Sequence, residues 1–329
     1  MVIGLGVGEQ HLRAFARDPR CRIAAICDFN AQQLERLASE FADVTRVADA
    51  DDILDDPAID VVSIATYDDM HAAQIIRALQ NGKHVFVEKP LCTSPGELRE
   101  IRGLLDSSPN LRISSNLILR RSPRFLELRR MIRAGEFGDL FHLQGDYNYG
   151  RLHKITRGWR GLRPTYSVVH GGAIHMIDLV LWLTGDQIVE VAAYGNRIAS
   201  RGSSFRFNDM VAAVLKFASG MAGTITANFG CVMPHNHGLT IHGTKATFIN
   251  GVPNGLLYRS RGPHDPPEIF DLPHPGAAKG DLIRGFIDSV VDNAEPEIQP
   301  RELFETMAVC IAIEQAAATG RAARVEQIQ

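Results

Sequence analysis

The chain has 329 residues, of which 45% are hydrophobic, and a formal net charge of −3. This length exceeds that of one ordinary hydrophobic core, so a soluble globular protein of two domains is predicted. Because the Lys and Arg residues are scattered rather than clustered, neither a nucleic acid nor an anionic membrane is expected as a partner.

The cysteines give no sign of an oxidising compartment. There are five of them, far apart and without C-x-x-C spacing, so neither a disulfide framework nor a structural zinc site is indicated. No signal-peptide pattern opens the chain, and the longest apolar run, residues 179–183, is far too short for a membrane span. A cytoplasmic protein is expected.

Residues 1–116 alternate short β-branched runs with helical patterns, which is typical of a parallel sheet covered by helices. Strands are predicted at residues 2–3, 22–27, 44–47, 61–65, 84–87 and 112–114, and helices at residues 10–17, 31–41, 71–80 and 95–105. The first strand is either unusually short or preceded by a few further residues. The predicted class is α/β, with residues 1–116 forming a doubly wound dinucleotide-binding domain of the Rossmann type.

Residues 117–329 follow a different pattern, with longer alternating segments and fewer helices between them. Helices are predicted at residues 122–133, 174–183, 282–292 and 301–319, and strands at residues 141–149, 189–198, 209–217, 221–229, 238–242 and 246–249. We expect an α+β domain for substrate binding and oligomerisation, with a largely antiparallel open sheet and a C-terminal helix able to pack back on the first domain.

A glycine-rich turn stands between the first strand and the first helix. Gly4, Gly6 and Gly8 occur where glycines let the backbone approach a pyrophosphate, although Gly8 comes one residue earlier than in the usual G-x-G-x-x-G pattern. Asp28, twenty residues after Gly8, ends the second strand, where a carboxylate accepts hydrogen bonds from a ribose diol and repels a 2′-phosphate. NAD is thus favoured over NADP, although Arg46 could weaken the preference. Asp28 could also cap the helix expected from residue 31.

Glu88, Lys89 and Pro90 follow the apolar run of residues 84–87. They place a lysine at the carboxyl end of a strand, where open α/β sheets bind their ligands.

Together with these motifs, nearly the whole chain resembles the Gfo/Idh/MocA family of NAD(P)-dependent oxidoreductases, named for glucose-fructose oxidoreductase and inositol dehydrogenase. The matching positions are residues 4–11, 64–66, 71, 82–85, 88–90, 120, 123, 135–138, 175–179, 243–245 and 319–321. The resemblance implies a dehydrogenase acting on CH-OH groups, with cofactor contacts from Gly4, Gly6, Gly8, Glu9, Gln10, Asp28, Ala65, Thr66, His71, Glu88, Lys89 and Asn116.

The resemblance also implies that Lys89 and His175 flank the reacting carbon. Histidine supplies a base that works near neutral pH, and lysine can donate a hydrogen bond to a developing alkoxide or relay the proton. The family commonly has an aspartate four residues before this histidine, where this chain has Gly171. His170 or Tyr166 could take over its polar role, or the proton route could run through Lys89 and His175 alone.

Residues 147–160 are rich in aromatic and hydrogen-bonding side chains, which suits a carbohydrate. The candidate substrate residues are Tyr147, Arg157, Trp159, Tyr166, His170, Asp178 and His235. Asp178 could instead be a buried helix carboxylate, and the basic residues between 151 and 163 favour an anionic substrate such as a nucleotide-linked sugar. His235, His237 and His242 lack an accompanying carboxylate or cysteine cluster, so no metal is expected.

The expected activity is hydride transfer between NAD and a hydroxyl carbon of a sugar, cyclitol, sugar acid or nucleotide-linked sugar. Two alternatives are an NAD-dependent glycosidase that oxidises its substrate transiently and a non-catalytic regulator that binds NAD or a sugar. Because an open antiparallel sheet leaves one face to be covered, a homodimer or homotetramer is expected.

Overall fold

The computed structural model describes residues 1–41 and 43–327 and divides into two compact units. The first unit comprises Met1–Ile118 and Ala278–Met307, and the second comprises Leu119–Ala277 and Ala308–Gln329. The sequence had suggested a boundary after residue 116, with a C-terminal helix able to pack back on the first domain. In the structure, the segment Ala278–Met307 belongs to the first unit.

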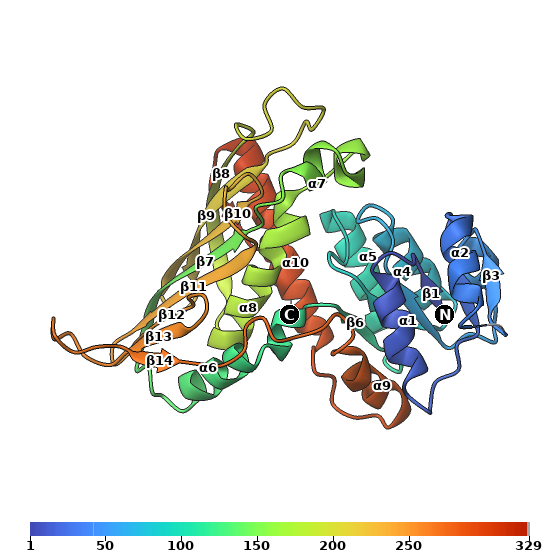
Figure 1. The fold of residues 1–329 in the computed structure, drawn as a ribbon, viewed down its shortest axis with the longest axis horizontal. Coiled ribbons are helices and arrows are strands. Elements are labelled where there is room, and N and C mark those ends of the chain that lie inside the picture. Colours follow the sequence, from blue (N-terminus) through green and yellow to red (C-terminus); the bar gives the residue numbers. More distant parts are fainter. Residues whose placement is uncertain (42, 328–329) are drawn as a thin grey trace. The chain divides into compact units, whose positions relative to one another are not determined.

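The first unit is built on a six-stranded parallel sheet in the order β3-β2-β1-β4-β5-β6 (Figure 1). The strands are β1 (Val2–Ile3), β2 (Ala25–Cys27), β3 (Thr45–Val47), β4 (Val61–Ile64), β5 (His84–Val87) and β6 (Ile113–Ser115). The helices are α1 (Gly8–Ala16), α2 (Ala31–Ala38), α3 (Asp51–Leu54), α4 (His71–Gln80), α5 (Pro95–Asp106) and α9 (Ile283–Val291). This strand order belongs to a doubly wound dinucleotide-binding fold and confirms the predicted class.

Continuous apolar strands explain why this sheet is parallel and buried. Val62, Val85 and Phe86 are completely buried, as expected for strands covered on both faces. Helix α9 joins this unit because Phe286 packs against Phe86 of β5, with 5.5 Å between the ring centroids. The apolar side of α9 therefore explains why Ala278–Met307 belongs to the first unit.

The second unit is built on a nine-stranded sheet in the order β14-β13-β12-β11-β7-β10-β9-β8-β15. Its strands are β7 (Leu140–Asn148), β8 (Ile188–Asn196), β9 (Met210–Phe217), β10 (Ala222–Asn228), β11 (Asn236–Gly243), β12 (Thr247–Ile249), β13 (Gly255–Tyr258), β14 (Glu268–Phe270) and β15 (Ala323–Arg324). Neighbouring strands are antiparallel except β7 and β10, which are parallel. The largely antiparallel sheet is as predicted.

The helical elements of the second unit are mostly short. They are α6 (Pro123–Arg133), α7 (His153–Thr156), the 3-10 turn η2 (Trp159–Leu162), the π-helix η3 (Val169–Ala173) and α8 (Ile174–Thr184). The 3-10 turn η1 (Ile118–Arg121) and helix α10 (Pro300–Thr319) each begin in the first unit and continue into the second. Within residues 1–41 and 43–327, no helix is long and apolar enough to cross a membrane.

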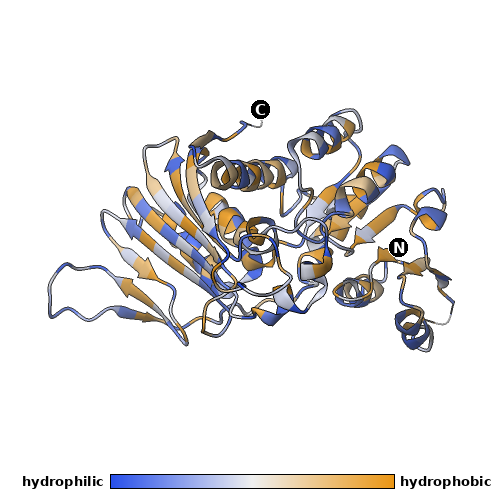
Figure 2. Ribbon diagram, turned by 90° about the horizontal axis from the view of Figure 1, so that it is seen from above, coloured by the Kyte–Doolittle hydropathy of each residue, from blue (hydrophilic) through white to orange (hydrophobic). Residues whose placement is uncertain are grey.

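Alternation along the strands gives the second sheet two different faces (Figure 2). One face packs on α8, where a side chain added at Gly145 of β7 would lie 3.4 Å from Met176. On the opposite face, Tyr194 of β8 and Val214 of β9 are 72% and 57% exposed.

Two buried guanidinium groups hold the second unit together. Arg120 donates to both carboxylate oxygens of Asp178 on α8, the shortest distance being 2.6 Å from Nη2 to Oδ1. Arg124 of α6 donates to the side chain of Asn250 and to three backbone carbonyls, including Pro253 at 2.7 Å. Such buried charges need these partners, because an unpaired one costs several kcal/mol.

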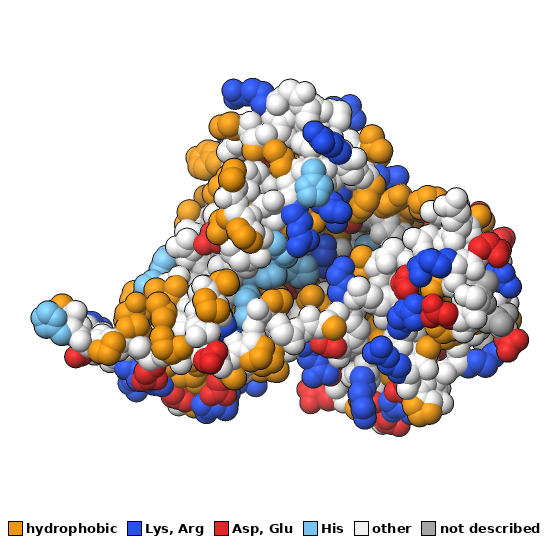
Figure 3. All heavy atoms as spheres, viewed as in Figure 1, with side chains coloured by type: hydrophobic (Ala, Val, Ile, Leu, Met, Phe, Trp, Pro, Cys, Tyr) orange, Lys and Arg blue, Asp and Glu red, His pale blue; other side chains and the backbone are white. Residues whose placement is uncertain are grey.

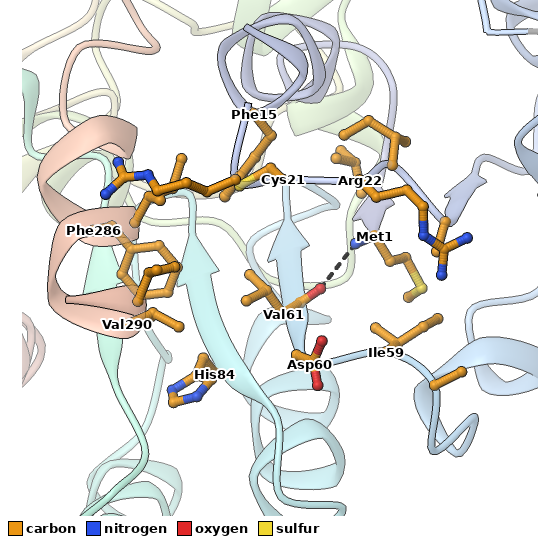
Figure 4. A pocket seen from close by; sticks show the side chains of 17 residues that line it. Met1, Phe15, Cys21, Arg22, Ile59, Asp60, Val61, His84, Phe286 and Val290 are labelled. Carbon is orange, nitrogen blue, oxygen red and sulfur yellow. Dashed lines mark hydrogen bonds between the residues drawn. The ribbon is translucent and has the colours of Figure 1, made fainter. Parts of the chain in front are cut away.

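A cavity of about 400 Å³ lies at the amino ends of the first sheet's strands (Figure 4). His84 of β5 and Phe286 and Val290 of α9 line part of its wall. The amino group of Met1 donates to the carbonyl of Val61 at 2.8 Å, and burial lowers the pKa of that amino group to about 6. Dinucleotides bind at the opposite, carboxyl edge of such sheets, so this cavity is not the cofactor site.

Candidate active site

Three glycines shape the turn between β1 and α1. Gly4 has φ +82°, and a Cβ there would lie 2.4 Å from the carbonyl oxygen of Ala65. A Cβ on Gly6 would meet no described atom within 4 Å, whereas one on Gly8 would lie 3.1 Å from the side chains of Ala65 and Val2. The glycines thus give a tight turn, an open backbone surface and close helix–strand packing. This surface fits a pyrophosphate despite the shortened spacing.

Asp28 fastens this turn to the end of β2. Its Oδ2 accepts a hydrogen bond from the backbone N–H of Leu5 at 2.7 Å, and its Oδ1 accepts one from that of Asn30 at 2.8 Å. The alternative role as helix cap is wrong, because the side chain of Asn30 caps α2. Arg46 forms an exposed ion pair with Glu35, with 3.6 Å between Nη1 and Oε1. The carboxylate is thus fixed where a dinucleotide-binding fold meets the adenosine ribose.

The two residues after Gly8 differ in their surroundings. Glu9 accepts hydrogen bonds from Arg36 and Arg13, which lower its pKa to about 2. Gln10 is exposed on the next position of α1. Of this pair, only Glu9 is engaged in a network that joins two helices.

A buried polar network holds Glu88 at the end of β5. His11 lies with Nε2 3.3 Å from Glu88 Oε1 and Nδ1 3.0 Å from Ser63 Oγ, while Asn116 Nδ2 donates to Glu88 Oε1 at 2.7 Å. Burial by itself raises the pKa of Glu88, but hydrogen bonds and charges from His11, Lys89 and Asn116 outweigh it and lower that pKa to about 2. Glu88 is therefore a carboxylate beside Lys89.

The roles of His11 and Ser63 were missed from the sequence. The only signal was a histidine three residues after Gly8, which gains meaning once α1 and β5 are adjacent. Among the described residues, Asn116 Oδ1 is buried and accepts no hydrogen bond. This leaves a polar acceptor next to Glu88, on the edge of the sheet where a dinucleotide binds.

His71 links the ends of β4 and β5. Its Nδ1 lies 2.7 Å from the carbonyl oxygen of Pro90 and its Nε2 lies 3.3 Å from that of Thr66. Thr66 Oγ1 in turn donates to Gln74 Oε1 at 2.7 Å. These contacts fix the segment that carries the half-buried Lys89.

In the second unit, His175 stands out on helix α8. Most α8 residues are buried, but the His175 side chain is partly exposed and stacks on Tyr147 of β7 at 5.9 Å. His237 of β11 lies 6.2 Å from His175, and His235 and His274 lie 4.8 Å and 5.8 Å from His237. We call His175, His235, His237 and His274 the imidazole cluster. Figure 3 shows histidine side chains gathered on this part of the second unit.

Burial favours the neutral form of three members of the imidazole cluster. Burial lowers the pKa of His235 and of His274 to about 4, and burial with the neighbouring imidazoles holds the pKa of His237 well below its usual value. Within the described part of the chain, no group of three metal-ligating side chains forms a metal site. His242 lies apart from the cluster, next to His142.

Other predicted substrate residues occupy different environments. Asp178 is buried and forms an ion pair with Arg120. Arg157 is exposed after α7, whereas His170 lies in the π-helix and is 4% exposed. The ring of Trp159 lies edge-on to that of Tyr166 at 6.2 Å.

Tyr166 fills the space beside Gly171. A Cβ at Gly171 would lie 2.2 Å from the Tyr166 hydroxyl oxygen, so any side chain there must displace the phenol. Arg160 donates from Nε to the same oxygen at 3.1 Å. The position of the family's usual aspartate is thus closed by a tyrosine hydroxyl.

Comparison with known proteins agrees with this architecture. Residues 1–114 match the model of an oxidoreductase family with an NAD-binding Rossmann fold, and residues 125–249 match the GFO/IDH/MocA C-terminal domain. A relative from Bacillus subtilis (strain 168), named scyllo-inositol 2-dehydrogenase (NAD(+)), is 28% identical over 260 residues, or 76% of this chain and 72% of the relative.

Solved structures share the fold over almost the whole chain. The myo-inositol 2-dehydrogenase of Lactobacillus plantarum has a TM-score of 0.84 at 21% identity and covers 99% of this chain and 98% of its own. A levoglucosan dehydrogenase in complex with NADH has a TM-score of 0.85 at 21% identity, with the same coverage. The matched family model and the glycine turn define an NAD-binding oxidoreductase. The chain belongs to the GFO/IDH/MocA family, as its motifs had indicated.

Proposed function

We propose that this enzyme transfers hydride between NAD and a hydroxyl carbon of an uncharged sugar or cyclitol, with Lys89 and His175 as catalytic residues. The main support is the group of imidazoles beside His175, since burial lowers the pKa of His235, His237 and His274 and favours their neutral forms at neutral pH. Neutral imidazoles both donate and accept hydrogen bonds, as hydroxyl groups do. An acid or phosphate substrate would instead call for guanidinium groups aimed at it.

The basic residues near position 160 give little support to an anionic substrate. Arg160 lies over the ring of Trp159 at 4.5 Å and donates to Tyr166, and Arg151 lies over the ring of Tyr149 at 5.3 Å. The inositol and levoglucosan named for the relatives are uncharged cyclic polyols, which agrees with the proposed substrate class.

The proposed chemistry uses a few side chains. Gly6, Asp28 and Asn116 would hold NAD, which when bound takes up the hydride. The Lys89 ammonium, stabilised by the Glu88 carboxylate, donates a hydrogen bond to the substrate oxygen as negative charge develops on it. His175 accepts the hydroxyl proton.

Replacement of the two catalytic residues tests the proposal. Lys89→Ala and His175→Ala should each lower kcat by about 10²–10⁴-fold in a screen of sugars and cyclitols, because each removes a proton-transfer or charge-stabilising group. Reduced nicotinamide is measured by its absorbance with NAD and NADP. His264→Ala, an exposed loop histidine, is the control and should behave as wild type. Wild-type turnover by either active-site variant would contradict the assignment.

Product analysis separates this activity from the two alternatives. A dehydrogenase accumulates NADH in step with oxidised product, whereas a glycosidase that oxidises its substrate transiently releases sugar without net NADH. A regulator binds NAD or sugar and turns over neither. Sugar release without net NADH would therefore contradict the proposed dehydrogenase activity and favour the glycosidase.

We also propose a cytoplasmic homodimer or homotetramer formed through the open face of the nine-stranded sheet. Tyr194 and Val214 are exposed apolar side chains on adjacent strands of this face, which a second copy of the chain would cover. Cys21, Cys27, Cys92 and Cys231 are thiols without disulfides, which suits a reducing compartment.

A further inference from the structure

His11 joins the helix behind the glycine turn to the end of β5. It lies on α1, whose first residue is Gly8, and its side chain is completely buried. Its Nε2 lies 3.3 Å from Oε1 of Glu88, directly after β5, and its ring meets that of Phe86 edge-on at 5.1 Å. A single side chain thus connects the helix that starts at the turn with the strand that leads to Lys89.

The partners of His11 assign the roles of its two ring nitrogens. Nε2 faces a carboxylate, which a nitrogen without hydrogen would repel, so Nε2 carries the hydrogen and donates to Glu88. Nδ1 is then an acceptor, and it lies 3.0 Å from the hydroxyl of the completely buried Ser63 of β4, which donates to it. Asn116 Nδ2 lies 3.3 Å from His11 Nε2 and donates to the same Glu88 oxygen at 2.7 Å. Ser63 therefore keeps the hydrogen of His11 on the side of Glu88.

These donors use only one of the two Glu88 oxygens. His11 and Asn116 both face Oε1, whereas within residues 1–41 and 43–327 no group donates a hydrogen bond to Oε2. The Glu88 side chain is 13% exposed, so a ligand can reach it. Burial raises the pKa of Glu88, and the hydrogen bond from His11 is the largest effect that lowers it. Oε2 is therefore an oxygen of a carboxylate that is held from one side and open on the other.

The strand order assigns this carboxylate to one half of the cofactor. Dinucleotides bind across the point where the strand order reverses, which in this sheet lies between β1 and β4. The glycine turn and Asp28 follow β1 and β2, on the side of the pyrophosphate and the adenosine. Glu88 follows β5 on the other side, where the nicotinamide half belongs. A fixed carboxylate there suits the diol of the second ribose, because carboxylates accept hydrogen bonds from ribose hydroxyls.

We propose that His11, with its hydrogen held in place by Ser63, is a positioning residue for the nicotinamide half of NAD. It acts through Glu88, whose Oε2 it orients towards the ribose diol. Because His11 lies on the helix that begins at the pyrophosphate turn, it fixes the two halves of the cofactor site relative to each other. The inference rests on NAD binding and is independent of the proposed substrate and of the role of His175.

Two ligands separate the halves of the site, because NADH contains both halves and ADP lacks the second ribose. His11→Leu should raise the Kd of NADH about 10-fold or more, as expected for a lost hydrogen bond to a charged group, and change that of ADP less than about twofold. His11→Gln, whose amide N–H can replace Nε2–H, should restore most of the NADH affinity. His84→Leu, at the amino end of the same strand, is the matched control and should bind both ligands as wild type. Fluorescence measures NADH binding and calorimetry measures ADP binding.

A double-mutant cycle tests whether His11 acts through the carboxylate. His11→Leu should have little further effect on the Kd of NADH in the Glu88→Gln background, because the group that His11 orients has already lost its charge. Ser63→Ala leaves the imidazole in place but removes the donor to Nδ1. It should raise the Kd of NADH about threefold or more and leave ADP binding unchanged, and it provides the same comparison if His11→Leu does not fold.

The outcomes separate this inference from the proposed function. Equal weakening of NADH and ADP binding in His11→Leu would assign the residue to packing of the turn and overturn the inference. Full addition of the His11→Leu and Glu88→Gln effects would do the same, and so would wild-type NADH affinity in His11→Leu, or in Ser63→Ala where His11→Leu does not fold. The proposed function fails instead if His175→Ala keeps wild-type turnover.

Discussion

At the scale of single residues, the turn between β1 and α1 depends on a glycine without a Cβ at position 4. Gly4 has a positive φ, and its missing Cβ leaves room for the carbonyl oxygen of Ala65. Gly82 also has a positive φ, of +69°, but a Cβ there would meet no described atom within 4 Å. A side chain at Gly82 would therefore cost only the strain of a left-handed backbone, whereas one at Gly4 would add a steric clash.

Alanine at these two positions should have different effects. Gly82→Ala should cost about 1–2 kcal/mol, the penalty for a left-handed L-residue, and leave NADH binding unchanged. Gly4→Ala should cost more and abolish measurable NADH binding, because the turn must move away from Ala65. Denaturant unfolding and NADH fluorescence titration measure the two effects. Equal losses in both variants would show that the clash is relieved without moving the turn.

Single residues also show which features of the candidate site could be predicted from the sequence. Asp28 was predicted from its place at the end of a strand, but its hydrogen bond to Leu5 depends on the fold of the turn. The contact between His11 and Glu88 joins residues 77 positions apart in sequence (88 − 11) and has no local pattern. Tyr166 was predicted as a substrate residue, but its close approach to Gly171 has no local pattern in the sequence.

At the scale of elements, three histidines with lowered pKa values make the second unit sensitive to acid: His237 in β11, His235 just before it and His274 after β14. An unfolded histidine binds a proton below about pH 6.5. In the folded protein, His235 and His274 stay neutral until about pH 4, and His237 is also protonated only well below the usual pKa. Between those pH values the unfolded state binds more protons, so stability is present above pH 6.5 and decreases as the pH falls towards 4.

Removing one of these imidazoles should reduce the acid sensitivity. We expect the Tm of the wild type to fall between pH 7 and pH 4.5. Over the same range, the free energy of unfolding of His274→Gln should decrease less than that of the wild type, by an amount on the order of 1 kcal/mol. His264→Gln, in an exposed loop, should keep the wild-type slope. Circular dichroism melts at several pH values provide the test, and parallel curves for wild type and His274→Gln would refute it.

The elements that the sequence predicted are those with strong periodicity. The predicted bounds of the parallel strands, α4 and α5 agree closely with the structure. Apolar runs mark these elements, and a capping box at Ser94 and Glu97 marks the start of α5. The short elements α3, α7, β13, β14 and β15 were missed, since two to four residues are too few to show a period. The π-helix η3 was missed too, because its wide turn has no sequence signature.

At the scale of the whole molecule, the open sheet face should control association. Val214→Lys places a charge on that face without changing the buried side of β9. We expect the variant to elute as a monomer, with its Tm measured alongside, because a buried lysine without a partner opposes assembly. Light scattering after size-exclusion chromatography gives the mass. If the variant stays oligomeric, another surface joins the subunits.

The discontinuous first unit has a consequence for synthesis on the ribosome. Residues up to Ile118 emerge early, but the segment that completes their unit begins at Ala278, about 160 residues later. At typical elongation rates of about 5–20 residues per second, this interval lasts roughly 10–30 s. Throughout it, Phe86 lacks its contact with Phe286. The nascent dinucleotide-binding unit therefore stays incomplete until strands β7 to β14 of the second sheet have been translated.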